Sequence, residues 1–295
     1  MPTLLEYRHR LRSVRQTQQI TRAMKFVAAA QLRRAQSRVF AARPYAEEIV
    51  RVLRSAAARV ETPFHPLLQR RPEQRLLVIV VTADKGLCGA FNSNVVRRAT
   101  TFLRSKQDRQ LLITAVGRRG RDALRRQGWP LAAEYTDVFR NVEFRHAREI
   151  ARQAADLFTE PKVDAVYAIY NEFKNVLVQK LIVEKVLPID PQVVASQETA
   201  PAPKRPGTEA DYIYEDPPEV VFERMLPRYL ESEIFRILLE SAAGEQAARM
   251  TAMDGATNNA ADLIERLTLE MNKVRQAAIT KEIIEVVSGA AATAA

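Results

Sequence analysis

One short loop carries the residue types that come nearest to a chemical site. Residues 84–89 read Asp-Lys-Gly-Leu-Cys-Gly and follow a run of apolar residues. A lysine in a glycine-containing loop can bind phosphate, but a phosphate-binding loop also needs Gly-Lys-Ser or Gly-Lys-Thr to hold phosphate and Mg²⁺. Because that sequence is missing, we interpret the loop as a tight turn between a strand and a helix.

Cys88 in this loop is the only cysteine of the chain, so no internal disulfide can form, which fits a reducing compartment. A nucleophilic cysteine needs a histidine close by to activate it. The three histidines, His9, His65 and His146, fall in separate segments with no spacing that indicates a site. We therefore predict no catalytic residue, no metal site and no bound cofactor.

A second polar group lies near the end of the chain. Gln276 and Thr280 are one helical turn apart and Arg275 lies beside them, so the three share one helix face. A helix seam does not need this many hydrogen-bonding groups on one face. Polar side chains are also ordinary on an exposed helix surface, so the residues alone leave the role of this group open.

Positive charge gathers at the other end. The first 60 residues hold 13 basic and three acidic residues, and their net charge of +10 equals that of the whole 295-residue chain. Such a surface suits an acidic protein or a nucleic acid. Few aromatic residues are interleaved among the arginines, which counts against single-stranded nucleic acid. A basic coiled-coil nucleic-acid-binding protein is kept as the alternative, and a nucleotide-dependent enzyme built on the central region as a second rival.

The elements that position these residues are of two kinds, and the chain ends form the first kind. Residues 4 to about 59 contain no glycine, and both ends carry apolar residues at nearly seven-residue spacing, which predicts an antiparallel coiled coil with both termini at one tip. Pro44 should bend or interrupt the first helix, and the second should begin after Pro217-Pro218 or after Pro227. The predicted seam residues are Leu4, Leu11, Val14, Met24, Ala28, Leu32 and Ala35 of the first helix, and Leu230, Ile234, Ile237, Ala248, Ala252, Ala256, Leu263, Leu267, Met271, Val274 and Ala278 of the second.

Between the helices the hydrophobic period changes to that of strands alternating with helices, which predicts a partly parallel sheet. The longest apolar run, residues 76–81, is too short to span a bilayer, and we expect a soluble chain without a secretory segment. Strands are predicted at 76–81, 111–116, 163–170 and 176–186, the last with a helix still possible, and helices at 93–103 with Asn92 or Ser93 as N-cap, after Gly117 and at 143–158.

The fold class is therefore α/β, with a long antiparallel coiled coil of the N- and C-terminal helices plus a central Rossmann-like α/β domain. The predicted divisions are the N-terminal coiled-coil helix at 1–60, the α/β domain at 75–195, a loop and short strand at 196–216, and the C-terminal coiled-coil helix at 217–295.

Four stretches of the chain carry a resemblance to a known family: Ser13–Ala30, Thr82–Asn92, Glu245–Met253 and Asn272–Ile283. Together they resemble the γ subunit of F-type ATP synthases, of the bacterial type, and the resemblance covers essentially the whole chain. Gly244 departs from it, because the family usually has serine there, and a glycine weakens a helix by roughly 1 kcal/mol relative to alanine.

The resemblance implies a central rotor shaft that does no bond chemistry and couples rotation of a membrane c-ring to conformational changes at catalytic β subunits. Its implied partners are a hexamer of α and β subunits that holds one copy, the ε subunit and the c-ring, with no nucleic acid. It implies contact with the membrane only through the c-ring, on the cytoplasmic face of the bacterial plasma membrane.

The resemblance also implies roles for single residues. Arg275, Gln276 and Thr280 match family positions that hydrogen-bond a loop of the β subunit, and Met24 and Lys25 match the position on the N-terminal helix opposite that face. Two more residues, Tyr212 and Glu215, match positions at the rotor foot that face the c-ring and ε.

Overall fold

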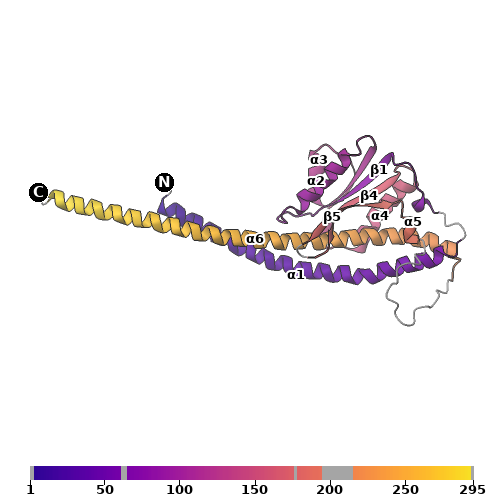
Figure 1. The fold of residues 1–295 in the computed structure, drawn as a ribbon, viewed down its shortest axis with the longest axis horizontal. Helices are drawn as coiled ribbons and strands as arrows, with labels where there is room; N and C mark the ends of the chain where they lie inside the picture. The colour runs from indigo at the N-terminus through magenta and orange to yellow at the C-terminus, as the bar shows by residue number, and fades with distance from the viewer. Residues whose placement is uncertain (1–2, 61–64, 176–177, 195–214, 294–295) are drawn as a thin grey trace. The chain divides into compact units, whose positions relative to one another are not determined.

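The computed structural model describes residues 3–60, 65–175, 178–194 and 215–293 (Figure 1). The chain forms two compact units, one of residues 1–30 with 249–295 and the other of residues 31–248. Two long helices, α1 (Leu4–Ala57) and α6 (Pro218–Thr293), contribute segments to both units. Among the described helices none is long and apolar enough to cross a membrane.

Each long helix contains a proline that does not end it. Pro44 lies inside α1 and Pro227 inside α6, so the interruption that we considered at Pro44 does not occur. A proline leaves the carbonyl four residues earlier without its helical partner. Pro44 and Phe40 are both exposed, so water can bind that carbonyl. The second helix takes the earlier of its two predicted starts, since proline suits the first helical position.

In the unit of residues 31–248, α1 and α6 run antiparallel. Val39 and Leu239 line one small cavity, and Arg54 lies within electrostatic reach of Tyr229. The apolar stripes that these two segments bury include predicted seam residues, and their buried members include Leu32, Val39, Ile49 and Leu53 of α1 and Leu226, Leu230, Ile234 and Ile237 of α6.

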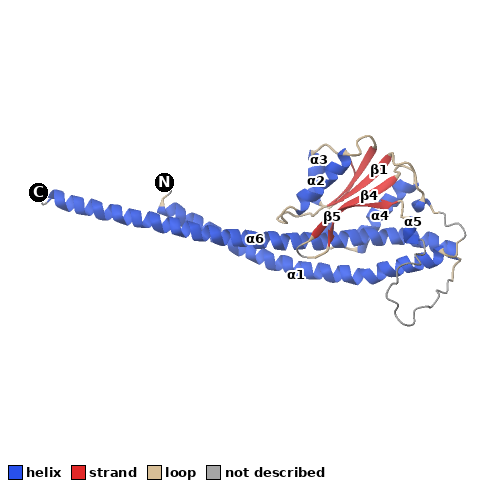
Figure 2. Cartoon of the chain, viewed as in Figure 1, coloured by secondary structure: helices blue, strands red, loops and turns tan. Residues whose placement is uncertain are grey.

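The same unit holds one five-stranded sheet in the order β3-β2-β1-β4-β5 (Figure 2). The first four strands are parallel, and β5 is antiparallel to β4. The four predicted strands are confirmed, and β5 is a strand rather than a helix. The strand bounds are β1 Arg75–Val81, β2 Gln110–Val116, β3 Leu131–Tyr135, β4 Ala165–Phe173 and β5 Gln179–Leu187.

Strand β3 was not predicted, because Leu-Ala-Ala-Glu-Tyr has no β-branched residue and its strand conformation depends on pairing with β2. The predicted helices of this unit are confirmed as α2 (Phe91–Arg104), α3 (Arg118–Arg126) and α4 (Phe144–Thr159), and a short α5 (Pro191–Val194) was not predicted.

Both faces of the sheet are covered. Val78 and Val80 of β1 pack with buried residues of α2 and α3 on one face. Leu77 and Ile79 are buried too and point to the other face, since side chains alternate along a strand. Helix α4 contacts β4. The continuous apolar run at 76–81 follows from this burial on both sides.

One guanidinium fastens α6 to the sheet. Arg236 Nη2 lies 3.0 Å from both carboxylate oxygens of Glu184 on β5, and its Nη1 donates to the Tyr170 hydroxyl on β4 at 3.0 Å. It also pairs with Glu233 at 2.8 Å and Glu240 at 3.4 Å on its own helix. The planar fork of arginine suits this many partners, which a lysine could not satisfy.

Burial disfavours charge in this network, and the network offsets part of that cost. Burial alone would lower the pKa of Arg236, but the carboxylates of Glu233 and Glu184 raise it above the ordinary value. Burial raises the pKa of Glu240, and Arg236 pulls it back in part. Arg236 therefore holds three carboxylates together at the contact between α6 and the sheet edge.

Replacing Arg236 by methionine should destabilise the protein by about 2–3 kcal/mol, because three carboxylates lose their shared cation. Chemical denaturation followed by circular dichroism measures this loss. Arg224→Met is the matched control: Arg224 pairs with Asp216 at 2.6 Å but is 70% exposed, so its loss should cost less than about 1 kcal/mol. Equal effects of the two changes would contradict this account.

Candidate functional site

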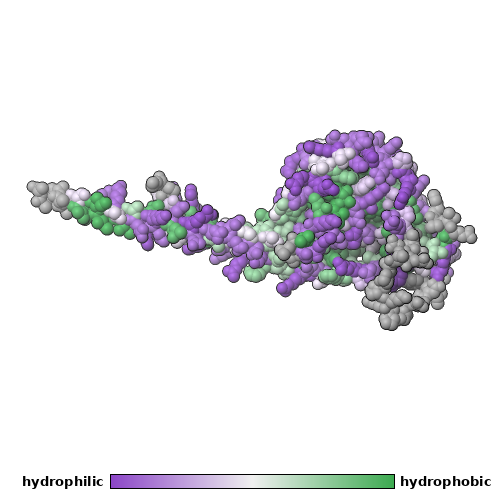
Figure 3. Space-filling view, viewed as in Figure 1, coloured by the Kyte–Doolittle hydropathy of each residue, from purple (hydrophilic) through white to green (hydrophobic). Residues whose placement is uncertain are grey.

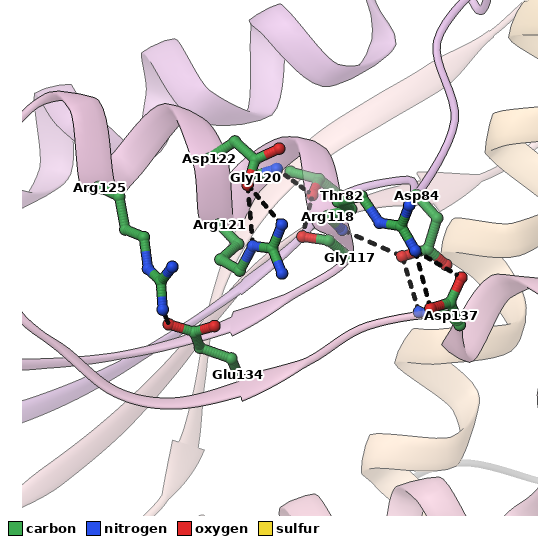
Figure 4. Close-up of polar contacts among 10 residues, drawn as sticks. All are labelled: Thr82, Asp84, Gly117, Arg118, Gly120, Arg121, Asp122, Arg125, Glu134 and Asp137. Atoms are coloured by element: carbon green, nitrogen blue, oxygen red, sulfur yellow. Dashed lines mark hydrogen bonds and ion pairs between the residues drawn. The ribbon is translucent and has the colours of Figure 1, made fainter.

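The loop after β1 is a structural latch. Asp84 Oδ1 accepts the backbone N–H groups of Arg118 at 3.0 Å and Asp137 at 2.9 Å (Figure 4). Its Oδ2 accepts the backbone N–H of Phe139 at 3.2 Å. Arg118 also pairs with Asp137 at 2.9 Å. One half-buried carboxylate thus ties three loops together at the carboxyl edge of the sheet, in line with the tight-turn interpretation.

The latch fills the place where an α/β protein could bind phosphate. A helix N-terminus attracts anions because its first N–H groups have no helical partner. At the start of α3 these groups are already bound: Arg118 N–H by Asp84 and Gly120 N–H by Thr82 Oγ1 at 2.8 Å (Figure 4). The Arg119 N–H is bound by the Ala83 carbonyl at 3.1 Å. The chain supplies its own acceptors here.

Helix α6 occupies the second place where a ligand would bind. Open α/β sheets bind ligands outside the carboxyl ends of the two strands where the strand order reverses, here β1 and β4. Asn171 in β4 is buried, and a Cβ on Gly244 of α6 would lie 3.7 Å from its Cβ and 3.4 Å from the Phe91 ring. The departure at Gly244 therefore lies where α6 approaches the sheet closely.

Cys88 is a packing residue. It is 1% exposed and clusters with Ala83 and Phe91, against which Ala248 of α6 packs. Asn92 Nδ2 approaches its sulfur at 3.2 Å. Neither Asn92 nor Ser93 caps α2 as predicted, because Asn92 Oδ1 accepts the Ala83 N–H at 2.8 Å and the N-cap is Ala90.

In the unit of residues 1–30 and 249–295 the two helices again run antiparallel. Lys25 Nζ pairs with Asp254 at 2.6 Å, and the hydroxyl of Thr257 donates to that of Thr21 at 2.9 Å. Lys25 is 37% exposed and Asp254 46%, so their pair contributes little stability. These polar contacts show the register in which the two helices pair.

The last apolar layer of this unit contains Tyr7, Leu11 and Leu267. Burial, and then the Glu270 carboxylate, raise the pKa of Tyr7. The predicted seam is wrong at Leu263, which is 38% exposed, and Ile264 packs against the layer in its place. A helix turns 100° per residue, so a strict seven-residue repeat drifts off the seam.

Beyond this layer α6 is uncovered. Val274 is the last residue that packs against α1, and every residue from 275 to 288 is exposed. α6 continues for about 28 Å from Arg275 to its end (Figure 1). The prediction that the two helix ends meet at one tip is therefore wrong, because α6 continues past the last residue that packs against α1.

Three of the predicted contact residues lie on this uncovered segment. Arg275, Gln276 and Thr280 are exposed, and the Thr280 hydroxyl donates to the Gln276 carbonyl at 2.9 Å. We expected Met24 and Lys25 to lie opposite these three residues, but they do not. Lys25 faces Asp254, which is about 32 Å along α6 from Arg275.

The foot residues are placed only in part. Tyr212 lies outside the described residues, and Glu215 is exposed in a bend directly before α6. The brief strand predicted around residues 211–215 lies outside the described residues except for Glu215.

Exposed apolar side chains were not among the predicted site residues. Those on α6 gather toward its C-terminal end, where Figure 3 shows a hydrophobic surface. The sequence could have indicated them, because these apolar residues occupy helix positions other than those of the predicted seam. They are Ile279, Ile283, Ile284, Val286 and Val287 on α6, and Leu5, Ile20, Phe26 and Val27 on α1.

The latch generates a test with two glycines. A Cβ on Gly117, whose φ is +93°, would lie 2.0 Å from the Thr82 carbonyl oxygen, so Gly117→Ala should destabilise the protein by about 2–4 kcal/mol. Gly255→Ala, in α6 with no atom within 4 Å, should instead stabilise it by about 0.5–1 kcal/mol. Denaturation midpoints of the full chain decide it, and a Gly117→Ala protein of unchanged stability would refute the close packing.

Comparisons with known proteins agree with this architecture. The family model described as "ATP synthase" matches residues 3–293. The chain is 49% identical to the ATP synthase gamma chain of Solibacter usitatus and 46% identical to that of Pelotomaculum thermopropionicum, with 99% of each chain covered in both cases.

Solved structures are similar as well. The central stalk and c-ring structure of the Tetrahymena thermophila mitochondrial ATP synthase matches at a TM-score of 0.59 and 27% identity, over 80% of this chain and 99% of that one. A chain of the Euglena gracilis mitochondrial enzyme has the same fold at a TM-score of 0.70 and 19% identity, over 98% and 94%. The chain belongs to the family of ATP synthase gamma chains.

Proposed function

We propose that this chain is the central rotor shaft of an F-type ATP synthase, which couples ion-driven rotation of the c-ring to conformational changes at the catalytic β subunits. The uncovered end of α6 carries the proposal. It combines hydrogen-bonding groups at Arg275, Gln276 and Thr280 with exposed isoleucines and valines, which suit a surrounding ring of other subunits. An exposed apolar patch on a helix usually marks such a contact.

The partners follow from the family. The shaft would stand as one copy within a hexamer of α and β subunits, with the ε subunit and the c-ring at its foot. It would reach the membrane only through the c-ring, on the cytoplasmic face of the bacterial plasma membrane. Glu215 and Tyr212 are the proposed foot contacts, and the exposed position of Glu215 allows this role.

The shaft would act by shifting conformational populations rather than by bond chemistry. Moving one catalytic site from 1:99 to 99:1 takes roughly 5.5 kcal/mol of differential contact energy. One charge crossing about 100 mV supplies roughly 2.3 kcal/mol, so several ions are needed for each step. The contacts must differ around the shaft, and a lone helix that emerges from a helix pair has no symmetry that would make them equal.

Electrostatics would let the shaft slide. The arginines of α1 in the first unit, among them Arg8 and Arg10, are exposed, and so is Arg33 in the other unit. Exposed ion pairs contribute only about 0–1 kcal/mol each, so an acidic partner could be attracted without being held at one angle. Met24 and Lys25 would contact a β subunit at a level separate from that of Arg275, since Lys25 faces Asp254.

The two rival functions have less support. A nucleotide-dependent enzyme would need the positions that Asp84, Thr82 and α6 already occupy at the carboxyl edge of the sheet. A nucleic-acid-binding protein is not suggested by the relatives, which are named ATP synthase gamma chains.

Reconstitution tests the proposal. Mixing the chain with the α and β subunits of the same organism should give a complex with one copy per hexamer and an ATP hydrolysis rate above that of the hexamer alone. Native mass spectrometry measures the stoichiometry and a coupled assay the rate. Absence of a complex, or an unchanged rate in its presence, would overturn the assignment.

Replacing Arg275 and Gln276 together by alanine should lower ATP hydrolysis and ATP-driven pumping about tenfold, because hydrogen bonds to a charged group contribute about 1.5–3 kcal/mol. Folding stability should not change, since both side chains are exposed. Lys281→Ala is the matched control, exposed on nearly the opposite face of the same segment. Full activity of the double variant would remove these residues from the contact.

A further inference from the structure

A basic groove lies between α2 and α3, and none of the residues that line it has a role in the proposed rotor contacts. Its volume is about 540 Å³, and four arginines line it: Arg97 and Arg104 on α2, and Arg119 and Arg126 on α3. The floor between them is formed by smaller side chains, which include Thr100 and Ala123. No carboxylate is among the described residues that line it.

Two kinds of contact fix the shape of the groove: packing of both helices against the sheet, and a hydrogen bond between the helices. The inner faces of both helices are buried against the sheet through Val95, Ala99 and Leu103 of α2 and Leu124 of α3. Across the groove the Thr100 hydroxyl donates to Gln127 Oε1 at 2.8 Å. The spacing of the two helices is therefore set before any partner binds.

Within the described part of the chain, none of the four groove arginines forms an ion pair with a carboxylate. Arg97 donates to the neutral amide oxygen of Asn94 at 3.0 Å, and no carboxylate pairs with Arg104, Arg119 or Arg126 there. The carboxylate of Asp122 forms its ion pair with Arg121 at 2.7 Å and interacts with Arg126 only through space. Four like charges around one groove repel each other, and a partner with negative charge would relieve this.

The spacing of the arginines selects the shape of that partner. On each helix the two arginines are seven residues apart, which is two turns or about 10 Å. A single phosphate is too small to contact all four arginines. It also could not bind the first N–H groups of α3, because these are already bound within the chain. A helix that carries carboxylates seven residues apart has the same spacing. Its side chains can pack into the groove between α2 and α3, above the small residues that line it.

We propose that the groove between α2 and α3 binds an acidic amphipathic helix of a partner protein, with the four arginines pairing to carboxylates two turns apart. This inference goes beyond the proposed function, which does not use this face of the α/β domain. Bidentate pairing with arginine would fix the register of the bound helix.

A peptide probe tests the groove on the full chain. The probe is a synthetic helix of about 20 residues with glutamates seven residues apart, and its comparison peptide has the same composition with the glutamates scattered around the helix. Fluorescence anisotropy at low salt should show the first binding about tenfold more tightly than the second, with loss of affinity as salt rises.

Arg104→Gln with Arg126→Gln should weaken the first peptide about tenfold or more, while Arg98→Gln should leave its affinity unchanged. Arg98 is the matched control, because it is exposed on α2 but does not line the groove. Circular dichroism checks that the variants fold. The proposal would be overturned if Arg98→Gln weakened binding as much as the double variant, or if the two peptides bound equally well. It would also be overturned if tripolyphosphate displaced the first peptide at a lower concentration than the unlabelled peptide does.

Hydrogen exchange in the assembled ATP synthase gives the second readout. Amides of α2 and α3 should exchange more slowly in the complex than in the free chain, and the Arg104→Gln, Arg126→Gln variant should lose that protection. Unchanged exchange at α2 and α3 in a complex that assembles and hydrolyses ATP would refute the groove as a docking site and leave the rotor assignment intact.

Discussion

An apolar stripe on a helix must be covered for the helix to persist in water, and both long helices of this protein obey that constraint until their cover ends. In the unit of residues 31–248, α6 is covered by α1 and by the sheet edge. In the other unit it is covered by α1 alone, down to the layer of Tyr7, Leu11 and Leu267. Past Val274 nothing in the described chain covers it, although isoleucines and valines continue. A segment built this way needs another protein around it.

In the α/β domain, the surfaces that usually bind ligands are covered by the chain itself. Its sheet has the order of a ligand-binding α/β protein, yet both places where such folds bind phosphate or nucleotide are taken by the chain itself. The latch of Asp84 and Thr82 binds the N-terminus of α3, and α6 packs beside Asn171 and Phe91. A fold used elsewhere for ligand binding is here a rigid attachment for a helix.

Arg236 gives that attachment a fixed geometry. A guanidinium that joins α6 to β4 and β5 through charged hydrogen bonds resists sliding of the helix along the sheet better than apolar packing does, because its geometry is directional. The exposed arginines of α1 have the opposite property. They attract without a fixed geometry, which suits a surface that moves past its partners.

The sequence alone determined much of the architecture. Apolar residues at a seven-residue period predicted the two long helices, and the runs at 76–81 and 111–116 predicted buried strands, because these patterns depend on local spacing. The missing Gly-Lys-Ser sequence was also readable without a structure. Strand β3 was not, since its sequence is weak in strand formers and β2 supplies its hydrogen bonds.

The site depended on tertiary structure to a greater degree. That Arg275, Gln276 and Thr280 share a face follows from the helical repeat, but that α1 ends before it reaches them follows only from the register of the pair. That register, shown by contacts such as Lys25 with Asp254 and Thr21 with Thr257, also separates Met24 and Lys25 from Arg275. A sequence pattern gives the face of each helix but not how far one helix is shifted along the other, because that shift is decided by contacts between residues more than 200 positions apart.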